Sequence, residues 1–381
     1  MKGETSSIIK VVSVYVGAVV GAGFASGQEI IHFFTRYGKE SCYGVILTGV
    51  LFSLLGCIIL DKVYLERIRS FEELVFPLAG LFLGRLIQIV SAVFLLSVYC
   101  VMIAGLGTII SIFFKLPLEY GVILASFICM IIMLVGVEGI AKVNVVLVPV
   151  LVVGVIATGI FIMSVIPGSP VARRGDAYAE AFNGLYIETF NLAGYIKSIT
   201  GNWIFSSILY VSYNNIIAMA VLSSLLPYLK TRRTAIAGGI LGGLLICFTA
   251  MILNICLLPF HPWNTAGEFP VATILERYSS FLTNMYNAVM LSAMLTSAVT
   301  SGYGAICGIS ARFKLNLKLA TIAVSALSVP LACIGFSRLI SSVYPLFGYV
   351  GMFMLLLLIL NWVTRLCSKS SLPKKRPGSS I

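Results

Sequence analysis

The sequence predicts an all-α integral membrane protein, and two observations support this prediction. First, 59% of the 381 residues are hydrophobic and only 10% are charged, whereas soluble domains carry roughly 25% charged residues. Second, apolar runs recur along the chain with one long polar interruption, at residues 167–201. A helix that spans a bilayer needs about 20 apolar residues. We therefore expect a single membrane domain over residues 1–381, with about ten transmembrane helices.

The expected spans form two sets of five, one on each side of the polar interruption. The first set, residues 8–166, has spans near 8–35, 42–64, 86–114, 118–138 and 145–166. The second set, residues 202–366, has spans near 202–226, 234–258, 283–308, 319–336 and 343–366. Because five is an odd number, the second set runs through the membrane in the opposite orientation. The sequence therefore predicts a five-plus-five inverted repeat.

The positive charge of the chain indicates membrane topology rather than nucleic-acid binding. The formal net charge is +12, but the lysines and arginines lie at the ends of the apolar runs and not on one face. Short loops rich in these residues stay in the cytoplasm, and most of the 26 fall on the inner side when the N-terminus is inside. We expect a multi-pass cell-membrane protein surrounded by lipid, with both termini cytoplasmic and a basic tail at residues 367–381.

A cluster of glycines lies in the middle of the first apolar run, at positions 17, 21, 23 and 27. Each glycine weakens a helix by up to about 1 kcal/mol relative to alanine, and unwound backbone is tolerated at membrane depth only where protein or a polar cavity surrounds it. The pattern predicts an interrupted helix that forms a binding site. The expected solute-binding residues here are Gly21, Ala22, Gly23, Ser26 and Gly27. Alternatively, Gly17 and Gly21 form a Gly-x-x-x-Gly face against another helix.

The sixth span carries hydrogen-bonding side chains at its middle, namely Ser212, Tyr213, Asn214 and Asn215. If the two repeats begin near residues 8 and 202, Gly21 is equivalent to Asn215, so the two polar positions coincide. Discontinuous helices at the interface of inverted repeats form solute sites in transporters. We therefore predict that helices 1 and 6 are both interrupted and share the solute. Tyr99 of the third span is a further candidate lining residue, although buried tyrosines commonly bond a local partner instead.

The stretch VGAVVGAGFASGQE at residues 16–29 resembles the first span of the YkvI-type bacterial membrane proteins. These resemble in turn the amino acid, polyamine and organocation (APC) transporter superfamily, whose members have the LeuT-like fold of five-plus-five inverted repeats with unwound helices 1 and 6. The resemblance implies a bacterial membrane protein with this fold. At the level of the spans it covers most of the chain, whereas the specific motif covers only residues 16–29.

Glu29 is the one acid well inside a predicted span, and intramembrane acids are by default functional, for example as proton carriers or counter-ions. Alternatively, Ser26 and Glu29 form a capping box for a helix that restarts after the break. The superfamily resemblance implies a sodium site between the first break and hydroxyls of the eighth span. The candidates there are Thr296, Ser297, Thr300 and Ser301, which could instead only join helices together. The expected coupling ion is sodium or a proton.

These features favour a secondary active, ion-coupled transporter of a small solute, most simply an amino acid or a similar amine or zwitterion, that works by alternating access. The alternative is a solute sensor or receptor subunit of the same fold that does not transport. We expect no enzyme activity, because we find one buried carboxylate and no pair. No other metal or cofactor is expected: the chain has only two histidines, and it contains no Walker-type phosphate-binding sequence.

Overall fold

The computed structural model describes residues 2–135, 137–165, 202–260, 268–313 and 315–370. Within these ranges the secondary structure is helical, and no strand occurs. The fold class predicted from the composition is confirmed. The polar stretch at 167–201 and the end of the predicted basic tail, residues 371–381, lie outside the described residues.

The first span consists of three helical pieces, α1 (Lys2–Val19), α2 (Ala22–Ser26) and α3 (Gln28–Phe33). The backbone is extended at Gly21, with φ −97° and ψ −165°, and left-handed at Gly27, with φ +87°. Glycine adopts the left-handed conformation at the lowest cost, and a Cβ at Gly27 would also lie 3.0 Å from a methyl group of Val271. The break that the glycines predict in the first span is therefore present in the structure.

The other helices overlap the predicted spans, although the helix Phe71–Phe114 begins well before the predicted span near 86–114 and its backbone is non-helical at Gly80 (φ +72°). In chain order they are α4 (Ser41–Glu66), α5 (Phe71–Phe114), α6 (Leu118–Val135), α7 (Val137–Val165), α10 (Trp203–Leu222), α11 (Arg232–Leu257), α12 (Pro270–Glu276), α13 (Ser280–Phe313), α14 (Leu317–Ala332) and α15 (Phe336–Ser370). Short 3-10 helices occur at η1 (Thr35–Glu40), η3 (Ser223–Tyr228) and η4 (Leu258–Phe260). Among the described residues, seven helices are long and apolar enough to cross a membrane, and two shorter apolar helices accompany them.

Helices at equivalent positions in the two predicted repeats pack against each other: α1 on α10, α4 on α11, α5 on α13 and α6 on α14. The α4–α11 crossing is built on glycines. A Cβ at Gly239 of α11 would lie 2.5 Å from the backbone nitrogen of Cys57, and one at Gly56 of α4 would lie 3.1 Å from the Cα atom of Gly239. Small residues let membrane helices approach closely. The two repeats, at residues 8–166 and 202–366, stay a prediction.

The sixth span differs from its prediction. Helix α10 is α-helical throughout Trp203–Leu222, so no interruption occurs at residues 212–215; the helix changes only at its end, to the 3-10 helix η3, which contains Pro227. The polar side chains bond within the helix: Ser212 Oγ donates to the carbonyl of Ile208 (2.6 Å), and Asn214 Nδ2 donates to the carbonyl of Tyr210 (3.1 Å). Because these groups find acceptors locally, they do not require an unwound backbone.

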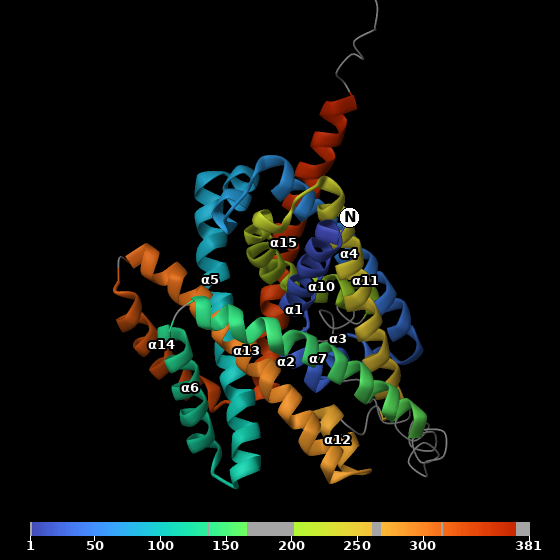
Figure 1. Cartoon of the computed structure of the whole chain (residues 1–381), viewed down its shortest axis with the longest axis vertical. Helices are drawn as coiled ribbons and strands as arrows, with labels where there is room; N and C mark the ends of the chain where they lie inside the picture. Colours follow the sequence, from blue (N-terminus) through green and yellow to red (C-terminus); the bar gives the residue numbers. More distant parts are fainter. Residues whose placement is uncertain (1, 136, 166–201, 261–267, 314, 371–381) are drawn as a thin grey trace, which may run out of the picture.

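The outer surface of the helix bundle is apolar. Along α6, the side chains of Ile123, Phe127 and Ile131 are exposed at four-residue spacing. Large exposed apolar surfaces mark contact with a partner or a membrane, and here they fit lipid. In Figure 1 the N-terminus and α12 lie toward opposite ends of the molecule.

Candidate functional site

The centre of the candidate site is Glu29, in the first turn of α3 directly after the glycine break. Its side chain is only 4% exposed, and the hydroxyl of Tyr213 on α10 donates a hydrogen bond of 2.7 Å to Glu29 Oε2. The carboxylate occupies space that a side chain at Gly23 would fill, because a Cβ there would clash with Glu29 Oε1. The absence of a side chain at Gly23 therefore lets Glu29 fold back over α2.

Aromatic side chains surround the carboxylate. The ring of Tyr213 lies 4.8 Å from that of Tyr344 and 5.5 Å from that of Phe33, between ring centroids, and Tyr210 lies 5.4 Å from Tyr213. The hydroxyl of Tyr210 is buried and has no hydrogen-bond partner among the described residues. No lysine, arginine or histidine in the described part of the chain forms an ion pair with Glu29. The site thus combines one carboxylate with an available hydroxyl donor in an aromatic enclosure.

The capping box predicted for Ser26 and Glu29 is not formed, because the N-cap of α3 is Gly27 and no side chain caps it. Ser26 Oγ accepts a hydrogen bond from the backbone nitrogen of Gln28 (3.2 Å) and donates one to the carbonyl of Gly23 (2.9 Å), so it links the two sides of the break. The side chain of Glu29 does not complete the box, because its hydrogen bond is with Tyr213 across to α10. Tyr286 of α13 donates to the carbonyl of Ala25, at the end of α2 (2.5 Å).

Of the four predicted sodium-site hydroxyls on α13, one faces the break. A Cβ at Gly21 would lie 3.4 Å from Ser297 Oγ. The others are directed elsewhere: Thr296 Oγ1 donates to the carbonyl of Ala293 (2.9 Å), Ser301 Oγ donates to the carbonyl of Ser297 (2.6 Å), and Thr300 is exposed. The structure therefore brings Ser297 to the break and does not gather all four hydroxyls there.

Among the four predicted polar residues of α10, only Tyr213 bonds to the broken first helix. Asn215 Nδ2 contacts the sulfur of Met219 in its own helix at 3.4 Å, and Ser212 and Asn214 bond to carbonyls one turn earlier. The backbone at Ser212 also packs directly against α15, where a Cβ at Gly351 would clash with the Ser212 carbonyl. These four residues are neighbours in the sequence, but they point in different directions around α10, so only Tyr213 reaches the broken first helix.

Tyr99 lies outside this centre. Its hydroxyl is hydrogen-bonded to Ser325 of α14 (3.2 Å), and a Cβ at Gly302 of α13 would lie 2.7 Å from its ring. Tyr99 therefore packs where α5, α13 and α14 meet. Sequence reasoning missed Tyr210, Tyr286 and Tyr344, and nothing in the sequence distinguishes them from the chain's other tyrosines. Within the described residues no group of three His, Cys, Asp or Glu side chains could hold a metal ion.

Comparison with solved structures defines the class of fold. MhsT in complex with L-phenylalanine matches with a TM-score of 0.62 at 17% sequence identity, over 90% of this chain and 86% of that one. A mutant of the manganese transporter of Eremococcus coleocola matches with a TM-score of 0.60 at 13% identity, over 91% and 77%. A Na+-coupled sialic acid symporter matches with a TM-score of 0.58 at 15% identity, over 90% and 76%. The chain has the LeuT fold of these proteins.

Two uncharacterized bacterial proteins are similar to the chain in sequence. The chain is 29% identical to the uncharacterized membrane protein YkvI of Bacillus subtilis (strain 168), over 92% of this chain and 95% of that protein. It is 27% identical to the uncharacterized protein YyaD of the same organism, over 91% and 94%. No family model matches the chain. The resemblance to YkvI that residues 16–29 indicate is confirmed along nearly the whole sequence, and the chain is a membrane-protein homologue of YkvI.

Proposed function

We propose that this protein is a secondary active transporter that moves a small solute across the cell membrane by alternating access, with both termini in the cytoplasm. The observation that carries the proposal is the break in the first span, where the buried carboxylate of Glu29 folds over Gly23 and bonds Tyr213 of α10. In LeuT-type folds, solutes and coupling ions bind at discontinuous helices between the repeats. The transporters among the structural neighbours support the same class of function.

The proposed solute is an amino acid or a similar amine or zwitterion. The carboxylate of Glu29 has no ion-pair partner in the described part of the chain, so it suits the ammonium group of such a molecule. The aromatic rings of Phe33, Tyr213 and Tyr344 provide an apolar face for a side chain. The structure of MhsT with L-phenylalanine is consistent with this choice.

The proposed coupling ion is sodium or a proton, and the two candidates use different residues. A proton would be carried by Glu29, which is buried and accepts the Tyr213 hydrogen bond. Sodium would bind oxygen atoms at the Gly21 break together with Ser297 Oγ, since hard cations prefer oxygen ligands. The Na+-coupled sialic acid symporter among the structural neighbours supports the second candidate.

The direct test is a thermal-stability screen of the purified protein against amino acids and amines, in sodium or potassium buffer and at two pH values. A ligand that binds the native state raises its apparent stability by mass action. We expect a stabilising solute whose effect grows with the coupling ion, because linkage makes each ligand strengthen the other. A screen in which no amino acid or amine stabilises the protein under any condition would contradict the proposed solute class.

A further inference from the structure

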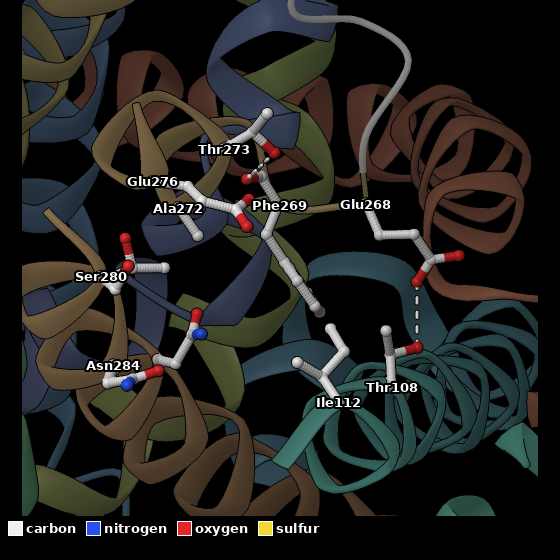
Figure 2. Close-up of a pocket in the computed structure, with 11 residues that line it drawn as sticks. Thr108, Ile112, Glu268, Phe269, Ala272, Thr273, Glu276, Ser280 and Asn284 are labelled. Atoms are coloured by element: carbon white, nitrogen blue, oxygen red, sulfur yellow. Dashed lines mark hydrogen bonds between the residues drawn. The ribbon is translucent and has the colours of Figure 1, made fainter. Parts of the chain in front are cut away.

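A second pocket lies between α5, α12 and α13, with a volume of about 330 Å³. Figure 1 places α12 toward the end of the molecule opposite the N-terminus, and Figure 2 shows the pocket in close-up. None of the residues that line this pocket is among those that surround Glu29. The volume is within the range that holds a small organic molecule.

One wall of the pocket is the segment that contains α12. Its lining residues Phe269, Thr273 and Glu276 recur at three- to four-residue spacing, which places them on one helical face. Glu268 directly precedes this face, and its Oε2 accepts a hydrogen bond from Thr108 Oγ1 of α5 (3.0 Å), as Figure 2 shows. The backbone carbonyl of Glu268 also accepts from Gln28 Nε2 of α3 (3.4 Å). The Glu268 side chain is therefore held at the pocket wall by a neighbouring helix.

The opposite wall is the first turns of α13, where Ser280, Asn284 and Asn287 line the pocket with the same helical spacing. Asn287 is only 8% exposed. Its side-chain amide forms no hydrogen bond with any described residue. The amide is not fully enclosed by protein atoms, so a molecule in the pocket can reach it. An unpartnered buried amide in the wall of a pocket indicates a place for a polar ligand.

The charges of the lining residues and the ring of Phe269 determine which kind of ligand the pocket favours. The described lining residues include two carboxylates, Glu268 and Glu276, and no lysine, arginine or histidine, so the pocket favours a cation. Phe269 lines it as well and packs on Phe336 with ring centroids 5.4 Å apart, and an aromatic face attracts a cation. The described residues offer no cluster of three side chains suited to a metal ion. An organic cation with an apolar part fits this combination better than a metal.

We propose that this pocket binds the protonated amine of a small organic molecule. The carboxylates of Glu268 and Glu276 attract the ammonium group, the amide oxygen of Asn287 accepts a hydrogen bond from it, and the apolar part of the ligand lies against Phe269. The inference rests on the pocket alone. It holds for a transporter and for a protein that binds solutes without moving them.

The test is isothermal titration of the purified full-length protein with 2-phenylethylamine, and with 2-phenylethanol and 3-phenylpropanoate as neutral and anionic analogues. We expect the amine to bind and both analogues to bind at least about tenfold more weakly, since hydrogen bonds to charged groups contribute this much or more. Glu268→Gln should weaken amine binding about tenfold or more for the same reason. Glu276→Gln should weaken it less, because the Glu276 side chain is exposed and water screens its charge. Glu119→Gln is the matched control, because Glu119 is an exposed acid of α6 that does not line the pocket, and its variant should bind as the parent protein does.

Three results would overturn the inference: no binding of the amine at millimolar concentration, equal binding of amine and alcohol, or unchanged affinity in both pocket variants. If Glu29→Gln removes amine binding while the two pocket variants keep it, the amine binds at the broken first helix. That result would overturn the second pocket as an amine site and leave the proposed transporter function unaffected. Thermal unfolding of each variant without ligand separates a lost site from a lost fold. Glu268→Gln retains an acceptor for Thr108, so we expect its unfolding temperature to match that of the parent protein.

Discussion

The first and sixth spans occupy equivalent positions in the two predicted repeats, yet one is broken and the other is a continuous helix. The first span contains glycines, which have no side chain to bond the backbone and which permit the left-handed turn at Gly27. The sixth span contains serine and asparagine, whose side chains bond carbonyls of their own helix at Ile208 and Tyr210. Polar side chains in the middle of a membrane helix therefore do not by themselves indicate an unwound backbone.

The two spans also contribute different groups to the site around Glu29. The broken first helix supplies backbone groups and the carboxylate of Glu29, whereas the intact helix α10 supplies the hydroxyls of Tyr213, which bonds Glu29, and of Tyr210. Variants of the two spans should therefore differ in their effects on stability and on solute binding.

Gly23→Ala should have the largest effect. The added Cβ would clash with the Glu29 carboxylate, and inserting a methyl group into a packed interior typically costs about 1–3 kcal/mol. We expect a lower unfolding temperature and loss of solute-driven stabilisation. Gly308→Ala on α13 is the control, because its Cβ would meet Ala92 at an ordinary 3.5 Å. Unchanged solute stabilisation in Gly23→Ala would contradict the proposed role of the break.

Glu29→Gln should come next. The variant preserves the shape of the side chain and an acceptor for Tyr213 but cannot release a proton. If Glu29 carries the coupling proton, transport in proteoliposomes should lose its dependence on a pH gradient while the protein stays folded. A Glu29→Gln protein whose uptake keeps its full pH dependence would exclude Glu29 as the proton carrier.

Tyr213→Phe should weaken transport less than Glu29→Gln does, since it removes a single hydrogen bond to a charged group, which contributes about 1.5–3 kcal/mol.

Ser297→Ala tests the other coupling ion. Because Ser297 is the α13 hydroxyl beside Gly21, its removal should raise the sodium concentration needed for half-maximal stabilisation by solute, by about tenfold if one ligand oxygen is lost. Ser292→Ala on the same helix serves as the matched control, since its hydroxyl bonds the carbonyl of Ala288. Equal sodium dependence in the two variants would place sodium elsewhere or favour a proton.

Asn214→Ala should have the smallest effect. Its amide bonds the Tyr210 carbonyl within α10, so the variant loses one local hydrogen bond, worth about 0.5–1.5 kcal/mol. Solute affinity should change little, which reverses the sequence-based expectation that Asn214 contacts the solute. Thermal unfolding and solute titration of the same sample measure both quantities. A large loss of affinity with an unchanged unfolding temperature would return Asn214 to the binding site.

The fold and the break could be predicted from sequence because each follows from local composition. Apolar runs set the positions of the spans, and the glycines at 21, 23 and 27 set the interruption of the first. The partners at the site could not be predicted in this way. Tyr213 bonds Glu29, whereas Asn214, the next residue, bonds its own helix, and only the rotation of α10 in the packed bundle decides between them. Likewise, Tyr286 bonds Ala25 although α13 is far from α2 in the sequence, and only the packing of the helices brings the two together.

Counterflow of a radiolabelled solute in proteoliposomes tests most directly whether the broken first span is the solute site of a transporter. The solute is the one that stabilises the purified protein most strongly in the thermal screen. We predict that the parent protein accumulates labelled solute against unlabelled solute inside the vesicles and that Gly23→Ala does not, while Gly308→Ala behaves as the parent protein. Solute binding by the parent protein without counterflow would contradict transport and indicate a sensor, and full counterflow in Gly23→Ala would contradict the location of the site.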